Sequence, residues 1–193
     1  ISEYPDEIKA QWDKNRDEAA AAGTAMHYDI ECYYNNCPRN NDSIEYQYFK
    51  QFVEDYPNLE PYRTEWTVFH EELRISGSID MVFRNKDDDT LSIYDWKRCR
   101  DIKKTDSKCS KNPVIEHIPD TNYWHYCLQL NTYKAILESK YDVKIRDMYL
   151  ICLHPDNQNK SYQRIKVMDM REDIKKLFDQ RRKQIKLLKE KVD

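Results

Sequence analysis

The sequence contains only two glycines, Gly23 and Gly77, and has no glycine-rich phosphate-binding loop. A nucleotide-driven motor built on a Walker-type loop is therefore not encoded in these residues. The absence of a Gly-x-Ser-x-Gly elbow argues against the serine hydrolases that use that turn. No apolar run reaches the roughly 18 residues that cross a bilayer, and no signal-peptide pattern opens the chain. The sequence thus predicts no membrane partner.

The six cysteines contain no Cys-x-x-Cys pair, which argues against zinc knuckles and zinc ribbons. Their wide spacing in a chain of 193 residues is typical of free thiols rather than of a disulfide framework. Free thiols indicate a reducing, intracellular compartment, either cytoplasm or nucleus.

An excess of charge of one sign is also lacking. Charged residues make up 35% of the chain, and the formal net charge is only -3. This balance argues against a protein coated in basic residues, but it allows a local basic groove that an acidic metal site offsets. The length predicts a single domain, and because the first residue is Ile1 rather than Met, we expect a fragment of a longer protein.

Periodicity predicts an α/β (α+β) domain with a central mixed sheet flanked by helices. Gly23 falls between two helical patterns in the opening stretch, where Thr24 would cap the second. The order is helix, helix, three strands, helix, two strands and helix. The domain is predicted to consist of a helical N-terminal region at residues 1–60, a sheet core at 61–170, which contains a long mobile loop at 101–120, and a C-terminal helix at 171–193.

Two carboxylates stand inside apolar strand patterns: Asp80 in "ISGSIDMVF" and Asp95 in "LSIYDWK". A buried carboxylate is costly unless it is paired or binds a metal. Two carboxylates from neighbouring strands can bind Mg²⁺ through oxygen. Because side chains alternate along a strand, Lys97 shares the face of Asp95, and Trp96 points into the core with its carbonyl available to the metal. A turn-capping Asp80 beside an exposed Asp95–Lys97 pair is the alternative.

The stretch "GSIDMVF…LSIYDWKR" resembles the core motif of the PD-(D/E)XK nuclease superfamily, with Asp95 at the position of the usual glutamate. Two further stretches resemble its RecB-type branch, which includes CRISPR-associated exonucleases and lambda-exonuclease-like enzymes. "GTAMHYDIE" (23–31) resembles the first-helix motif of the branch, and "QLNTY" (129–133) its glutamine-x3-tyrosine motif. The resemblance implies a restriction-endonuclease-like core.

The resemblance also implies a metal site with Mg²⁺ or Mn²⁺ as cofactor. The metal ligands would be His27, Asp80, Asp95 and the backbone carbonyl of Trp96, and mixed His and Asp ligation suits Mn²⁺ as well as Mg²⁺. Asp80, Asp95 and Lys97 would be the catalytic residues, with Lys97 positioning the attacking water or helping to deprotonate it.

Five further residues are assigned around this centre. Gln129 and Tyr133 lie four positions apart on one helix face and would hold a DNA phosphate or base, although Tyr133 also belongs to an apolar stripe. Arg98 would contact the nucleic-acid backbone. Glu65 and Glu31 would support the site from behind the metal ligands.

Cluster-binding members of the branch carry four cysteines, one near the first-helix motif and three close together downstream. Cys32 and Cys37 lie near the first place, but no downstream triplet follows. The sequence therefore argues against an iron–sulfur cluster.

The implied function is a metal-dependent DNA nuclease, an exonuclease acting on single-stranded or duplex DNA ends through one or two metal ions. A helicase or other domains would belong to the longer parent protein. One alternative is an RNA endonuclease of the cap-snatching kind, against which the Gln129–Tyr133 pair counts. The other is a catalytically silent DNA-binding module, against which the intact Asp80, Asp95 and Lys97 count.

Overall fold

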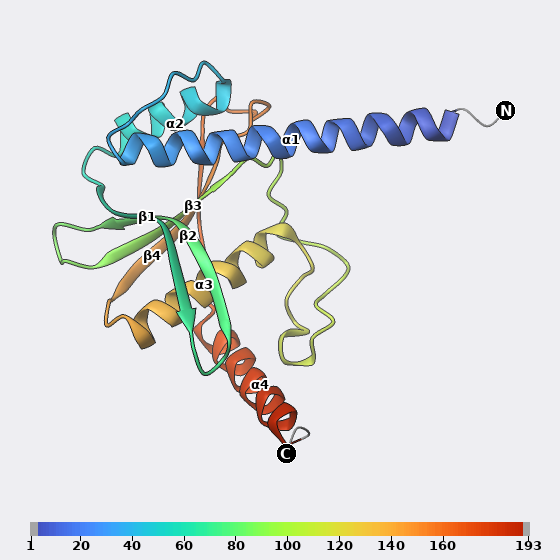
Figure 1. The fold of residues 1–193 in the computed structure, drawn as a ribbon, viewed down its shortest axis with the longest axis vertical. Helices are drawn as coiled ribbons and strands as arrows, with labels where there is room; N and C mark the ends of the chain where they lie inside the picture. The colour runs from blue at the N-terminus through green and yellow to red at the C-terminus, as the bar shows by residue number, and fades with distance from the viewer. Residues whose placement is uncertain (1–3, 191–193) are drawn as a thin grey trace.

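A single five-stranded mixed sheet forms the centre of the computed structural model, which describes residues 4–190 (Figure 1). The strand order is β1-β2-β3-β4-β5, and only the β3–β4 pair is parallel. A parallel pair needs a long crossover, which α3 supplies. The predicted fold class is confirmed. The elements are α1 (Tyr4–Tyr34), α2 (Ile44–Asp55), β1 (Glu60–His70), β2 (Ile75–Arg84), β3 (Leu91–Lys97), α3 (Asn122–Lys140), β4 (Ile145–Cys152), β5 (Gln163–Lys166) and α4 (Arg171–Lys189).

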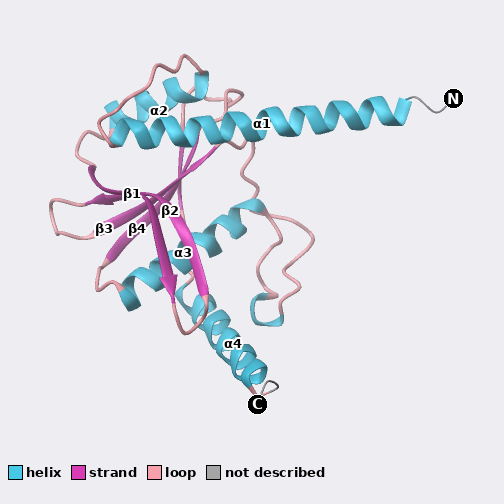
Figure 2. Cartoon of the chain, viewed as in Figure 1, coloured by secondary structure: helices cyan, strands magenta, loops and turns pink. Residues whose placement is uncertain are grey.

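Helices cover both faces of the sheet (Figure 2). On one face, α2 packs through Phe49 and Phe52 against Trp96 of β3, and α1 contributes Tyr34, whose ring stacks on Trp96. On the other face, α3 packs through Leu130 and Leu137 against a second apolar cluster that also receives α4. The central strand β3 is buried along almost its whole length because it lies between these two layers.

The opening stretch forms one continuous helix, so the prediction of a break at Gly23 is wrong. Thr24 does not cap a second helix, because its Oγ1 donates to the carbonyl of Ala20 one turn earlier, at 3.0 Å. Glycine costs about 1 kcal/mol within a helix, and the alanine run before it together with the packed turns after it outweigh that cost.

The first half of α1 projects away from the sheet (Figure 1). Trp12 is 69% exposed and Ile8 43% exposed, and Met26 is the first residue of the described chain that is fully buried. Within the part of the chain that the structure describes, the side-chain hydrogen bonds of this half are made to neighbours on the same helix, for example by Asp13, which accepts from Arg16 at 2.9 Å.

The predicted mobile loop at 101–120 is packed against the domain. Ile115 and Ile118 are buried in the cluster beneath α3, and Cys109 pairs with Pro119 in an isolated β-bridge. Asn112 donates to Gln180 of α4 at 2.8 Å. The loop thus closes one side of the sheet core.

Two of the predicted segments extend beyond the described residues. Residues 1–3 of the predicted helical N-terminal region and residues 191–193 of the predicted C-terminal helix lie outside the described residues. Across residues 4–190, no helix combines the length and the apolar character needed to cross a membrane.

Candidate active site

His27 and Asp80 meet where α1 crosses β2. The Nε2 atom of His27 lies 3.2 Å from Asp80 Oδ2, and the same oxygen accepts the backbone N–H of Trp96 at 3.0 Å. A residue of the first helix and a residue of β2, 53 positions apart, are thereby joined to β3. The contact of Trp96 is made by its N–H, so the role expected of its carbonyl stays a prediction.

Asp95 and Lys97 share one face of β3, as strand alternation predicts, while Trp96 packs on the opposite face. Lys97 Nζ lies 2.7 Å from Asp95 Oδ2, and the Asp95 residue is only 3% exposed. The Lys97 ammonium is the one polar partner of this oxygen among the described residues. A carboxylate buried to this degree is costly unless it is paired or binds a metal.

The charges of the site act on one another. Burial and the nearby Asp80 carboxylate raise the pKa of Asp95 to about 7, against the opposing effect of Lys97. Burial works against a charged lysine, but Asp95 and Asp80 hold the pKa of Lys97 above its ordinary value. Lys97 is therefore an ammonium group that can orient a water or a phosphate oxygen, rather than a base that accepts a proton.

Gly23 fixes the orientation of the His27 ring. The Nδ1 atom lies 2.8 Å from the Gly23 carbonyl, which only accepts, so Nδ1 carries a proton. Burial lowers the pKa of His27, but the hydrogen bond and charge of Asp80 outweigh it and raise the pKa to about 9. The proton on Nε2 thus occupies the place that a metal ion would take. Loss of that proton would direct the free Nε2 lone pair into the site.

A groove of about 460 Å³ opens beside these residues, and Gly23, His27, Glu31, Glu65 and Asp80 are among its lining residues. Both supporting glutamates predicted from the sequence therefore lie near Asp80. Glu65 Oε2 accepts from the hydroxyl of Ser78 at 3.2 Å, and burial together with Asp80 raises its pKa.

The backbone of β1 is distorted beside Asp80. Glu65 has a φ of 43°, in the left-handed region that costs a non-glycine residue about 1 kcal/mol or more. It lies between Thr64 and Trp66, whose partners Met81 and Ile79 flank Asp80 on β2. The distortion therefore faces the acidic residue of the site.

Gln129 and Tyr133 interact with each other near the acidic residues. Gln129 Nε2 donates to the Tyr133 hydroxyl at 3.0 Å, and the charges of Asp95, Asp80 and Lys97 all act on Tyr133. Tyr133 is 8% exposed and covers Gly77, where a Cβ atom would lie 2.5 Å from the ring. Gly77 thus allows the ring of Tyr133 to lie close against the backbone of β2. The contact of Gln129 with a substrate stays a prediction.

Arg98 is engaged within the protein. Its Nε donates to Glu45 Oε1 of α2 at 2.6 Å, and the two side chains are only 18% and 9% exposed. The predicted contact with a nucleic-acid backbone would have to use the remaining nitrogens of the guanidinium group.

Glu45→Ala should destabilise the protein by about 2 kcal/mol, because it leaves the half-buried Arg98 guanidinium without its partner. Urea denaturation of both proteins measures the change. Glu54→Ala, on the exposed side of the same helix, should change stability by less than about 0.5 kcal/mol. Equal stability of Glu45→Ala and the parent would contradict a structural role for the pair.

The donor set fits a divalent metal ion, although no three His, Cys, Asp or Glu side chains within residues 4–190 already form a metal cage. The Nε2 atom of His27 and Asp80 Oδ2 bind each other through a proton, and Asp95 Oδ2 is paired with the Lys97 ammonium. A cation that displaces the His27 proton would be held by His27 and Asp80, with Asp95 on the neighbouring strand as a further carboxylate. One imidazole and two carboxylates are donors that Mn²⁺ and Mg²⁺ accept.

The stability of the metal-free protein should fall as pH rises. The folded-state pKa of Asp95 is about 7 rather than 3.8, and that of His27 about 9 rather than 6.5, so the folded state holds more protons than the unfolded state across this range. Stability is therefore lost between about pH 4 and 7 through Asp95 and up to about pH 9 through His27. Thermal denaturation in EDTA at pH 6, 7 and 8 measures this fall.

Added Mn²⁺ should reverse the loss, because the metal competes with the same protons. The gain in Tm should be larger at pH 8 than at pH 6, and Asp80→Asn should abolish most of it. A gain independent of pH, or preserved in Asp80→Asn, would place the metal elsewhere.

Sequence reasoning missed one neighbour of Lys97. The Lys97 Nζ atom lies 4.6 Å from the ring centroid of Tyr126 of α3. Tyr126 precedes Gln129 by three residues and Tyr133 by seven, so helical spacing already places these residues on one face.

The chain matches a known protein family. The model of the PD-(D/E)XK nuclease superfamily matches residues 7–193, almost the whole chain. No curated protein matches the sequence.

Proposed function

Because the chain belongs to the PD-(D/E)XK nuclease superfamily, we propose that it is a divalent-metal-dependent DNA nuclease that attacks DNA ends. The RecB-type branch is consistent with this family. The observation that carries the proposal is the meeting of His27 of α1 with Asp80 and the Asp95–Lys97 pair of two neighbouring strands, beside an open groove.

Each residue has a separate role in phosphodiester hydrolysis. His27, Asp80 and Asp95 would hold the ion, with the carbonyl of Trp96 as a further ligand. A bound Mg²⁺ or Mn²⁺ would supply Lewis-acid chemistry and a more acidic water. Lys97 would orient the attacking water and stabilise negative charge on the phosphate in the transition state. Gln129 and Tyr133 would hold the strand beside these groups.

Cleavage of end-labelled linear single-stranded and duplex DNA, beside a closed circle and RNA, tests the proposal in Mn²⁺, Mg²⁺ and EDTA. We expect metal-dependent loss of linear DNA and survival of the circle. Cleavage of the circle would replace the exonuclease by an endonuclease, and preferential cleavage of RNA would favour the cap-snatching alternative. Tight DNA binding without turnover in any metal would favour the silent module.

Lys97→Ala should lower the cleavage rate by about a hundredfold, because the transition state loses its ammonium group. Lys104→Ala is the matched control, since Lys104 Nζ also lies over a tyrosine ring, 4.7 Å from the centroid of Tyr123. The control should turn over saturating DNA at the parent rate. Equal rates of Lys97→Ala and the parent would remove Lys97 from the mechanism.

A further inference from the structure

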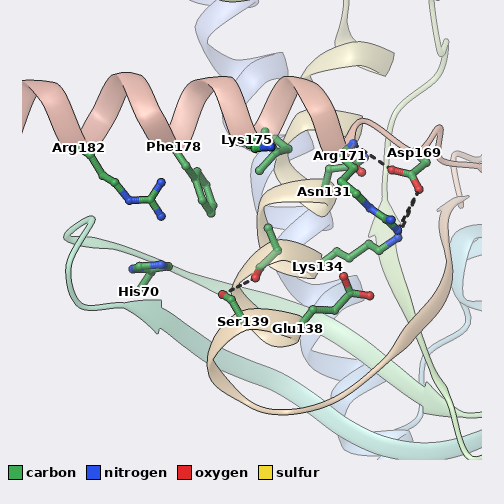
Figure 3. Close-up of a pocket in the computed structure, with 12 residues that line it drawn as sticks. His70, Asn131, Lys134, Glu138, Ser139, Asp169, Arg171, Lys175, Phe178 and Arg182 are labelled. Carbon is green, nitrogen blue, oxygen red and sulfur yellow. Dashed lines mark hydrogen bonds and ion pairs between the residues drawn. The ribbon is translucent and has the colours of Figure 1, made fainter.

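A second pocket, of about 280 Å³, lies between α3, α4 and the end of β1 (Figure 3). Lys134 and Glu138 of α3 line it, and helical spacing places them on the side of α3 away from Gln129 and Tyr133. The pocket is therefore separate from the active-site groove, and none of the residues assigned to catalysis lines it.

The charge of the pocket is positive. Four cationic side chains line it against two carboxylates, which leaves a net charge of +2: the cations are Lys134, Arg171, Lys175 and Arg182, and the carboxylates are Glu138 and Asp169. Both carboxylates are engaged by the protein. Asp169 lies 3.6 Å from Lys134 Nζ and accepts from the backbone of Arg171, and Glu138 accepts from the backbone of Ile145.

Two buried side chains in the pocket wall retain hydrogen-bond donors that no acceptor of the described chain uses. His70 is 4% exposed, and its Nδ1 accepts the N–H of Leu73 at 3.4 Å, so the neutral ring carries its proton on Nε2. Burial lowers the pKa of His70 and thereby favours this neutral form. Throughout the described chain, no side chain or carbonyl accepts from Nε2. Lys134 is 9% exposed, and Asp169 is its one ion-pair partner among residues 4–190.

The wall between these polar groups is apolar. Phe178 and Ile174 of α4 and Ala135 of α3 form it. Figure 3 shows Phe178 and Arg182 pointing from α4 toward His70, and Lys134 and Arg171 gathered around Asp169 at the other end. The pocket thus has a cationic end, where Lys134 and Arg171 both lie 3.6 Å from Asp169, and an aromatic end with the Nε2 donor of His70. Arg182 lies at the aromatic end, where its Nη1 also donates to Asp179 at 2.8 Å.

We propose that this pocket binds a nucleoside monophosphate, either free or at the end of a strand. The phosphate binds at Lys134, Arg171 and Lys175, because charge-assisted hydrogen bonds to phosphate are strong. The base lies on Phe178, and its acceptor atoms receive the donors of His70 and Arg182. The volume is at the small end of ligand pockets, which fits one nucleotide. Binding here does not depend on the nuclease activity proposed above.

Calorimetric titration of the full chain in EDTA tests the proposal without a metal-bound phosphate at the active site. Thymidine monophosphate should bind more tightly than inorganic phosphate and more tightly than thymidine, by about tenfold in each case. No measurable binding of the monophosphate, or equal affinity for inorganic phosphate, would overturn it. A 5′-phosphorylated oligonucleotide whose affinity falls in Lys175→Ala assigns the site to a strand end, and one that is insensitive assigns it to the free nucleotide.

Neighbouring residues of α4 provide matched variants. Lys175→Ala and Arg182→Ala should each weaken binding of the monophosphate about tenfold. Lys176→Ala and Lys183→Ala remove exposed cations that do not line the pocket, and both should bind within twofold of the parent. Equal losses in all four variants would indicate attraction by the net charge of α4 alone and would overturn the assignment.

Discussion

Asp95→Asn should make the metal-free protein more stable at pH 8 while slowing metal-dependent cleavage by at least about a thousandfold. The loss of activity follows from removing a charged oxygen that would bind the metal. The gain in stability follows from burial, because the Asp95 residue is 3% exposed and its carboxylate is close enough to Asp80 for its pKa to rise to about 7. Asparagine removes that charge, and its amide oxygen can still accept a hydrogen bond from Lys97.

The gain should depend on pH in a defined direction. A shift of this size corresponds to a few kcal/mol of destabilisation once Asp95 is ionised. At pH 8 the full gain is expected, and near pH 4 it should almost vanish because Asp95 is then largely protonated in both the folded and the unfolded state. Urea denaturation in EDTA at the two pH values measures both.

Asp147→Asn provides the control on the neighbouring strand. Asp147 accepts from Ser92, and its carboxylate lies 3.6 Å from Arg146. Its replacement should lower stability slightly and leave cleavage unchanged. If Asp95→Asn were instead less stable than the parent at pH 8, the Asp95–Lys97 ion pair would outweigh the repulsion from Asp80, and the cause given for the pKa of Asp95 would be wrong.

Gly77→Val should cost about 3 kcal/mol or more in the free energy of unfolding. A Cβ atom at this position would lie 2.5 Å from Cε1 and 2.8 Å from the hydroxyl of Tyr133. The ring cannot move freely, because it is buried and its hydroxyl accepts from Gln129. Displacement of Tyr133 should also lower cleavage, since its ring lies beside the acidic residues. Denaturation and cleavage assays on the same preparation separate the two effects.

Two further variants test the cause of that cost. Tyr133→Ala opens space over Gly77, so the double variant should be less destabilised than the sum of the single variants. Gly23→Ala is the control for the other glycine, because nothing lies within 4 Å of a Cβ atom there. It should stabilise α1 by about 1 kcal/mol. Strict additivity of Gly77→Val and Tyr133→Ala would contradict the steric explanation.

The strands and the positions of Asp95 and Lys97 could be predicted, because the patterns that indicate them lie within a few consecutive residues. Strand alternation alone places Lys97 with Asp95 and turns Trp96 toward the opposite layer, and the structure has both. The position of His27 beside Asp80 needed the family resemblance, because a contact across 53 residues leaves no mark in periodicity.

Other features depend on tertiary packing that no local pattern encodes. Glycine propensity predicted a break at Gly23, but the packed turns that follow hold the helix together. The sequence alone leaves Arg98 without a partner, whereas in the folded chain Glu45 of α2 lies beside it and accepts its hydrogen bond. The pocket at His70 is formed by three elements distant in the sequence, so its net charge could not be read from any one of them.

The projecting half of α1 means that one helix contains two thermodynamic units. An isolated helix of this length is marginal in water, so the exposed turns before Ala20 can unwind and rewind without unfolding the domain. Gly23 and His27 both lie inside the packed unit, where the Gly23 carbonyl and Asp80 hold the His27 ring. The geometry of the candidate site is thus insulated from the behaviour of the projecting turns. A partner that binds along these turns would change the free energy of ordering them without changing the stability of the candidate site.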